Sequence, residues 1–163
     1  MRDSRIAPIY EGTNEVQAAD LVMRKLTARE GQLADRFFDV WKPFFNEHRN
    51  DEDLATFIKP ASEAFDRLLE VTATIRAQIK TDRAVARGSA TDYQRLFGLT
   101  VIACFWADIL VSIQGREGDF YRAKRKVGQF YMQHILPDTL ALQRVITEGT
   151  EALSAFDIAQ FQP

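Results

Sequence analysis

The sequence is poor in cysteine, histidine and proline, and its charges nearly cancel. Cys104 is the single cysteine among 163 residues, so we expect neither a disulfide framework nor a cysteine-rich metal site, and the cytoplasm is the expected compartment. The formal net charge of −2 does not favour general binding to nucleic acid. The first ten residues lack the apolar core of a secretory signal, so none is expected.

The two histidines do not fit a metal centre. A di-iron site in a helical bundle needs Glu-x-x-His motifs on facing helices. Phe45, not Glu, stands three residues before His48. Tyr131 stands three residues before His134. The histidine spacing therefore predicts no di-iron site. Glycine-rich nucleotide-binding loops and the Gly-x-Ser-x-Gly motif are also missing, so the sequence predicts neither a loop for nucleotide phosphates nor a serine nucleophile of this type.

Apolar residues at helical spacing dominate the chain. Hydrophobic residues make up 46% and charged residues 27% of it, which is typical of a folded globular domain. The pattern predicts helices over residues 14–26, 32–48, 54–79, 91–114 and 119–147. Four of these are long and are joined by short loops. We therefore predict an all-α fold, an antiparallel four-helix bundle with an additional N-terminal helical segment.

Capping and breaking residues mark the expected helix ends. Residues 50–53 supply caps for the third helix. Pro60 should kink that helix or delay its start, and Pro137 should bend the fifth helix. Residues 81–92, with Gly88 as a breaker, form the clearest predicted linker.

The fourth predicted helix is apolar around most of its circumference, so we expect it to be central or to lie at an interface. Residues 96–113 are the nearest approach to a membrane span, but Asp108 lies among them, and a charge inside a span is costly. We interpret this segment as a buried helix, with Asp108 paired to a cation of the fifth helix.

Glu63 and Arg67 are expected to pair on the outer face of the third helix. Five basic residues lie in the fifth predicted helix and in the loop before it, and we interpret them as a solvated face: Arg116, Arg122, Lys124, Arg125 and Lys126.

Glu11 is the candidate catalytic residue, within the stretch "RDSRIAPIYEGTNEVQ" (residues 2–17). Gly12 lets a ligand approach the backbone closely. Thr13 and Asn14 offer a hydroxyl and amides at a helix start, which suits an anionic or electron-rich group. A glutamate before glycine is more often a surface acid than a base. Desolvation by a bound ligand could nevertheless raise its pKa and let it abstract a proton.

Two stretches near the front resemble the C-terminal catalytic region of the acyl-CoA dehydrogenases: "IYEGTNEVQ" (residues 9–17) and "DLVMRKL" (residues 20–26), preceded by Arg2, Asp3, Arg5 and Ile6. The rest resembles the helical C-terminal extension of one bacterial branch of that family. Its matching stretches are "ATDYQRLFGL" (90–99), "FYRAK" (120–124), "FYMQHILPDT" (130–139) and "EGTEAL" (148–153). The resemblance divides the chain into a remnant of the catalytic domain (residues 1–26) and a helical bundle (residues 27–163).

The resemblance also implies an activity. Family members bind FAD, remove two hydrogens from the α and β carbons of an acyl-CoA thioester and pass electrons to an electron-transfer acceptor, and a homo-oligomer is expected. Glu11 matches the base that takes the α proton while the flavin takes the β hydrogen as hydride. Gly12 matches the residue beside the substrate. Thr13, Asn14 and Glu15 match the turn that touches the flavin nucleotide.

The flavin-holding β domain and the N-terminal helices of that family have no counterpart in these 163 residues. We therefore expect a C-terminal fragment of an FAD-dependent acyl-CoA dehydrogenase, inactive alone and without bound FAD. Glu15 and Met23 depart from the extension-bearing relatives, which tend to have Gly and a small residue there. One alternative is a stand-alone helical module for oligomerisation or docking, with the fourth helix as its interface. Another is a branch linked to alkylation stress and DNA, which the slight acidity disfavours.

Overall fold

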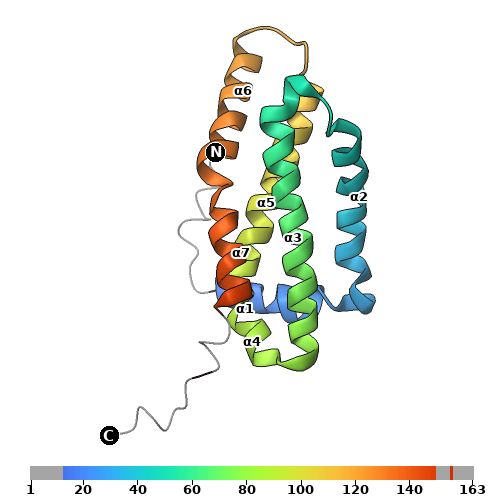
Figure 1. Ribbon diagram of the computed structural model, residues 1–163, viewed down its shortest axis with the longest axis vertical. Coiled ribbons are helices and arrows are strands. Elements are labelled where there is room, and N and C mark those ends of the chain that lie inside the picture. The colour runs from blue at the N-terminus through green and yellow to red at the C-terminus, as the bar shows by residue number, and fades with distance from the viewer. Residues whose placement is uncertain (1–12, 150–154, 156–163) are drawn as a thin grey trace, which may run out of the picture.

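Four long helical rods form the bundle, and each successive rod runs opposite to the one before it (Figure 1). The computed structural model describes residues 13–149 and 155. Among these residues every regular element is helical, so the predicted all-α class is confirmed. The rods are α2 (Gln32–His48), α3 (Ala55–Thr81), α5 (Ala90–Ser112) and the consecutive helices α6 (Asp119–Phe130) and α7 (Asp138–Glu148).

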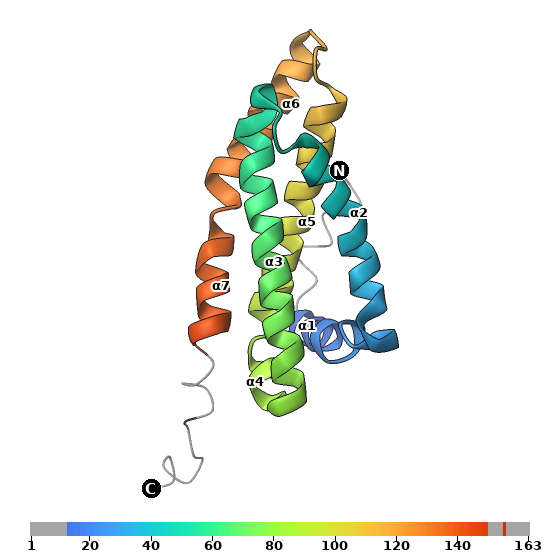
Figure 2. The same ribbon diagram turned by 45° about the vertical axis from the view of Figure 1, so that its right-hand side comes forward.

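Shorter helical pieces join the rods. α1 (Asn14–Asp20) and α4 (Arg83–Gly88) both lie at the lower end of the bundle, where α3 ends and α5 begins (Figures 1 and 2). A π-helical turn, η2 (Leu21–Lys25), extends α1 directly. The remaining connecting pieces are single turns: η3 (Ala28–Gly31), η4 (Glu52–Leu54) and η5 (Tyr131–Ile135).

An aspartate caps η4, the 3₁₀ turn that leads directly into α3. Asp51 Oδ1 accepts hydrogen bonds from the backbone N–H groups of Asp53, at 3.1 Å, and Leu54, at 3.3 Å. The N–H groups at the beginning of a helical segment have no partner one turn earlier, and the carboxylate supplies one for Asp53, while the N–H of Leu54 also donates to the Asp51 carbonyl at 3.3 Å. The cap predicted within residues 50–53 is confirmed.

The predicted linker over residues 81–92 is wrong, because most of it is helical. Asp82 accepts hydrogen bonds from the N–H groups of Ala84, at 2.9 Å, and Val85, at 3.2 Å. This cap begins α4 immediately after α3 ends. Gly88, the predicted breaker, is the last residue of α4, and α5 begins two residues later at Ala90.

Pro60 and Pro137 act differently on their helices. α3 runs through Pro60 without interruption and begins at Ala55, so the predicted delay of its start is not observed. At the second proline the rod is interrupted. The N–H of Leu136 donates to the carbonyl of Tyr131 at 2.9 Å, a π-type bond, and α7 begins just after Pro137. Because proline lacks the N–H that would continue the α-helical ladder, this interruption follows from the sequence.

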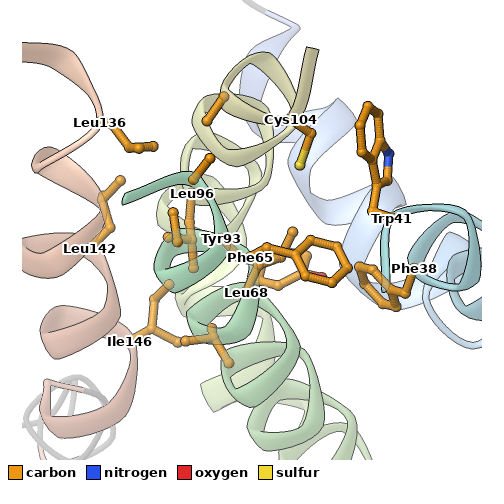
Figure 3. Packing of buried hydrophobic residues seen from close by; sticks show 14 of the residues in the cluster. Phe38, Trp41, Phe65, Leu68, Tyr93, Leu96, Cys104, Leu136, Leu142 and Ile146 are labelled. Atoms are coloured by element: carbon orange, nitrogen blue, oxygen red, sulfur yellow. The ribbon is translucent and has the colours of Figure 1, made fainter. Parts of the chain in front are cut away.

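The core lies where α3, α5 and α7 meet, and α2 packs on its side through aromatic rings (Figure 3). Leu68 of α3, Leu96 of α5 and Ile146 of α7 are all buried there. Phe38 of α2 makes an edge contact with Phe65 of α3, with ring centres 6.1 Å apart. Full burial of side chains of this kind contributes about 1.5–3 kcal/mol each, so these contacts supply the main driving force for the bundle.

α5 is long and apolar enough to cross a membrane by length and composition alone, with a mean hydropathy of 1.6. Tyr93, Leu96 and Cys104 are nevertheless buried within the bundle. Only 33% of the apolar window is buried, and Asp108 lies on the exposed side. The expectation that Asp108 is buried and paired is therefore wrong. A helix that is apolar on all sides does not reveal from its sequence which side faces solvent.

Arg67 turns toward α7 and does not form the outer-face pair predicted with Glu63. Its Nε donates to Gln143 Oε1 at 3.0 Å, and its NH1 donates to Thr139 Oγ1 at 3.1 Å. Desolvation lowers the pKa of Arg67, and Glu63 nearby opposes that effect. The side chain therefore joins two rods of the bundle.

Candidate functional site

The structure describes three of the five predicted site residues. Thr13 is the N-cap residue of α1, and its carbonyl accepts the N–H of Gln17 at 2.9 Å. Asn14 and Glu15 follow it on the exposed first turn. Glu11 and Gly12, the proposed base and its neighbour, lie outside the described residues.

The first turn of α1 is placed by apolar contacts further along the segment. Ala18 in α1, Val22 in η2 and Leu26 after it are buried, and they recur every four residues. The π-helical turn, closed by the N–H of Leu26 donating to the carbonyl of Leu21 at 2.9 Å, keeps these side chains on one face. That face packs on α5, so the bundle fixes the position of α1.

Two depressions lie between α1 and α4, and Glu15 is the one described site residue that borders either of them. The first has a volume of about 310 Å³ and is bordered by Glu15, Val16, Ala19, Arg87, Gly88, Ala90 and Thr91. The second, of about 530 Å³, is bordered by Ala19, Met23, Arg83, Ala84 and Arg87. Because they share Ala19 and Arg87, we treat them as one α1–α4 groove.

The α1–α4 groove combines a cationic edge with an apolar floor. Arg83 and Arg87 are one helical turn apart on α4, and both are exposed. Guanidinium groups in this position can bind phosphate or carboxylate oxygens. Val16, Ala19 and Met23 supply apolar surface opposite them. The groove can therefore accept an amphipathic ligand that carries negative charge.

Sequence reasoning missed Arg83 and Arg87 because residues 81–92 were interpreted as a linker. Asp82 was the available signal, since an aspartate followed by residues at helical spacing predicts a capped helix. Once α4 is recognised as a helix, the spacing of four residues places both arginines on one side of it.

The basic group near α6 is not simply a solvated face. Arg125 NH2 donates to the carbonyls of Ile113, at 3.1 Å, and Arg116, at 2.6 Å, so it satisfies backbone groups at the end of α5. Lys124 Nζ lies 5.7 Å from the centre of the Trp106 ring, within cation–π range. Arg116 and Arg122 are exposed and contact Tyr121 and Asp119 respectively, and Lys126 is also exposed.

Metal ligation finds no support in the part of the chain that the structure describes. No three His, Cys, Asp or Glu side chains of residues 13–149 and 155 come close enough together to hold a metal ion. The single thiol, Cys104, is buried, and burial raises the pKa of Cys104 to about 12. A neutral, buried thiol is neither a good nucleophile nor a good metal ligand.

A match over most of its sequence places the chain in a known protein family. The family described as "Acetyl-CoA dehydrogenase C-terminal like" matches residues 24–157, and the chain belongs to this family. The matched segment includes α2 to α7 and begins after α1, so the described site residues Thr13, Asn14 and Glu15 precede it.

Two curated proteins are similar to most of the chain. The 3-methylmercaptopropionyl-CoA dehydrogenase of Ruegeria pomeroyi is 27% identical over 93% of this chain and 27% of its own length. The butyryl-CoA dehydrogenase of Syntrophomonas wolfei is 21% identical over 89% of this chain and 25% of its own length. The chain thus spans about a quarter of the length of the relatives it matches. It is an acyl-CoA dehydrogenase-like C-terminal domain.

Proposed function

We propose that this chain is the C-terminal part of an FAD-dependent acyl-CoA dehydrogenase, which introduces a double bond between the α and β carbons of an acyl-CoA thioester. The observation that carries the proposal is the family match over residues 24–157. The names of two relatives, both CoA-thioester dehydrogenases, support the same reaction class. The enzyme passes its electrons to an electron-transfer acceptor and works in the cytoplasm.

Residues 1–26 belong to the catalytic part, and residues 27–163 form the bundle behind it. Glu11 takes the α proton of the substrate, and Gly12 lies beside the thioester. Thr13, Asn14 and Glu15 contact the flavin nucleotide. The packing of α1 on α5 supports this assignment, because it gives the catalytic segment a rigid base.

The described residues do not fit a complete flavin site. Arg83 and Arg87 could neutralise a diphosphate, but no aromatic side chain borders the α1–α4 groove to stack on a flavin ring. FAD supplies the hydride acceptor for the reaction when it is bound. We therefore propose that the flavin is held by other parts of the parent enzyme and that this chain alone is inactive.

Glu11→Gln in the parent enzyme tests the assignment of the base. The amide keeps the size of the side chain but cannot accept a proton, so turnover should fall at least about 10³-fold while acyl-CoA binding changes little. Glu47→Gln, an exposed change on α2, is the matched control and should keep turnover normal. Normal turnover in the Glu11→Gln enzyme would show that Glu11 is not the base.

The isolated chain provides a second test. Purified chain mixed with FAD and an acyl-CoA should retain no yellow colour after gel filtration and should not reduce an artificial electron acceptor. Turnover by the isolated chain would overturn the proposed dependence on further domains.

A stand-alone helical module for docking or oligomerisation is the second candidate, and the exposed apolar side of α5 favours it. The two candidates differ in the DNA upstream of Met1. A reading frame encoding a β domain in continuity with this chain supports the enzyme, whereas a stop codon and a separate ribosome-binding site support the module.

A further inference from the structure

α6 turns its apolar side chains toward solvent. Exposed residues at spacings of three and four run along one side of this helix and onto the π-helical turn after it, and we call them the α6 strip: Phe120, Ala123, Val127, Phe130 and His134. Phe120, Val127 and Phe130 are 65%, 51% and 55% exposed. The rings of Phe130 and His134 stack with their centres 4.9 Å apart, so the strip is continuous from the helix to the turn.

The opposite side of α6 packs on the bundle through a glycine. Gly128 is the single buried residue among the 12 of this helix. A Cβ atom added there would lie 2.9 Å from Leu110 Cδ1, so α6 and α5 approach closely at this point. A surface helix normally turns its apolar stripe toward the core. α6 does the reverse at the edge of the bundle (Figures 1 and 2), and contiguous exposed apolar surface of this kind marks an interaction site.

Cations border the α6 strip on both sides. Arg122 and Lys126 lie one turn apart along one edge, and both are exposed. Lys124 lies along the other edge, where its Nζ atom is 5.6 Å from the centre of the Phe120 ring. Asp119 is the one acidic residue of the helix, and Arg122 pairs with it. The exposed apolar side chains are therefore flanked by positive charge.

We propose that the α6 strip docks this chain onto an anionic lipid surface, with α6 lying in the plane of the headgroups. The apolar side chains of the strip enter the boundary between headgroups and acyl chains, and the flanking cations contact lipid phosphates. Residues 116–134 contain five Lys or Arg and two Asp or Glu, in a chain whose net charge is −2, so the positive charge is local to this helix. The proposal does not rest on the proposed enzyme activity, since it uses only residues of the bundle.

Charge distinguishes the α6 strip from other exposed apolar residues of the bundle. Phe105 of α5 is 53% exposed, but the exposed carboxylate of Asp108 lies one turn further on. Val145 of α7 is 52% exposed, and Glu148 follows it in the same way. An anionic surface repels carboxylates and attracts lysine and arginine. The α6 strip is therefore better matched to anionic lipid than either of these sites.

The shape of the α6 strip favours a lipid surface over a partner helix. A partner helix binds by laying its apolar face into a groove. The strip instead follows the outside of a single helix at the edge of the bundle, which is a convex ridge (Figure 1). A fluid headgroup layer closes around a ridge of this kind, and long lysine and arginine side chains reach the phosphates on either side of it.

Co-sedimentation of the complete 163-residue chain with lipid vesicles provides the first test. Vesicles of phosphatidylcholine with about 30% phosphatidylglycerol should bind the chain at least tenfold more tightly than vesicles of pure phosphatidylcholine. Salt at about 0.5 M should weaken this binding, because it screens the attraction between the cations and the headgroups. Equal affinity for the two compositions, or no binding to either, would overturn the proposal.

A matched pair of substitutions tests the apolar contact. Phe130→Asp and Leu140→Asp change residues of the same rod that are 55% and 56% exposed, so both variants should stay folded, as circular dichroism checks. Phe130→Asp should weaken binding to the anionic vesicles at least about tenfold, because it places a carboxylate within the strip. Leu140→Asp should weaken it about twofold or less. Equal losses would show that the total charge, and not the strip, determines binding, which contradicts the proposal.

A second pair tests the cations. Lys126→Glu and Lys59→Glu change the net charge by the same amount, and both lysines are exposed, on α6 and on α3. Lys126→Glu should weaken binding to the anionic vesicles at least about fivefold more than Lys59→Glu does. If the two variants bind alike, the cations of α6 have no special role and the proposed orientation is wrong.

Tryptophan fluorescence separates insertion of the strip from adsorption by charge alone. Phe130→Trp keeps an aromatic ring in the strip, and its emission should shift to shorter wavelength on anionic vesicles and be quenched by brominated acyl chains. Leu140→Trp should show neither effect, and Trp41 and Trp106 give the background that the unsubstituted chain measures. Binding without a shift in Phe130→Trp would contradict insertion. A chain that ignores vesicles but binds soluble polyglutamate through the same strip would assign the strip to an acidic protein and overturn the lipid proposal.

Discussion

Arg76 of α3 binds the backbone of Gly31, which lies 45 residues earlier in the chain, where α2 begins. Its NH2 donates to the Gly31 carbonyl at 3.0 Å, and its NH1 donates to Asp35 Oδ1 at 2.9 Å. Three successive residues before α2 have positive φ: Arg29 (51°), Glu30 (59°) and Gly31 (90°). The two hydrogen bonds from Arg76 therefore stabilise an unusual backbone turn that connects the α1 segment to the bundle.

Gly31→Ala should lower the free energy of unfolding by about 1–3 kcal/mol. The new Cβ would lie 2.9 Å from Arg76 NH2, and alanine at a φ of +90° adds backbone strain. Urea unfolding followed by circular dichroism measures the change. In an Arg76→Met background the clash is removed, so the cost of Gly31→Ala should be smaller. An unchanged cost would show that the strain, and not the clash, dominates.

Thr72 and Tyr93 should respond unequally to loss of their shared hydrogen bond. Thr72 Oγ1 donates to the Leu68 carbonyl at 2.7 Å, so the Tyr93 hydroxyl, also 2.7 Å away, is the donor to Thr72. Tyr93→Phe leaves Thr72 with a partner and should cost about 1 kcal/mol. Thr72→Val leaves a buried hydroxyl without an acceptor and should cost more, about 1–3 kcal/mol.

The double variant checks this interpretation. Thr72→Val with Tyr93→Phe removes both polar groups together, so its cost in urea unfolding should be well below the sum of the two single costs. Additive costs would mean that the Tyr93 hydroxyl finds another acceptor when Thr72 is replaced. The difference between the two single variants would then have another cause.

Gly128 and Gly98 form a matched pair of helical glycines. A Cβ at Gly128 would lie 2.9 Å from Leu110 Cδ1, a buried methyl group, whereas a Cβ at Gly98 meets nothing within 4 Å. Both substitutions to alanine gain about 1 kcal/mol in helix propensity, but only Gly128→Ala overpacks the core. At concentrations where the chain is monomeric, Gly98→Ala should raise the melting temperature, and Gly128→Ala should not. A similar rise in both would show that Leu110 moves aside easily.

The sequence predicted α2 well because its apolar periodicity is strong. Residues 32–48 were expected to be helical, and α2 has these bounds. α4 was missed, since Gly88 was weighted above the capping side chain of Asp82. Asp108 was misplaced because α5 is apolar on every side, so periodicity does not indicate which face packs.

The candidate site was less predictable than the fold. The position of Thr13, Asn14 and Glu15 depends on the later residues of the same segment, which anchor it to the bundle by their burial. The apolar pattern of the sequence does predict that these later residues are buried. The α1–α4 groove depends on the approach of two helices more than 60 residues apart in the chain. A local pattern does not specify such a contact.

Alkaline pH should destabilise the protein through groups that the core keeps protonated. Burial raises the pKa of Cys104 from 9.0 to about 12. Burial likewise raises the pKa of Tyr131 from 10.0 to about 12 and the pKa of Tyr93 well above its ordinary value. Between the ordinary and the raised values the unfolded chain has lost these protons and the folded chain has kept them. Stability is therefore fully present below about pH 9 and falls as the pH rises toward 12.

The free energy of unfolding should thus be lower at pH 11 than at pH 8 by about 2 kcal/mol or more, since each unit of pKa difference corresponds to about 1.4 kcal/mol. Urea titrations at both values measure this difference. Tyr131→Phe removes one titrating group, so the loss of stability between pH 8 and pH 11 should be smaller in that variant. Its stability at pH 8 should also fall, because the hydrogen bond that the Tyr131 hydroxyl donates to the Leu99 carbonyl at 2.8 Å is lost. Cys104→Ala should flatten the same interval further, because the thiol has the lowest ordinary pKa and begins to lose its proton first in the unfolded chain. If both variants keep the slope of the parent chain, the alkaline loss arises from the surface lysines and not from the core.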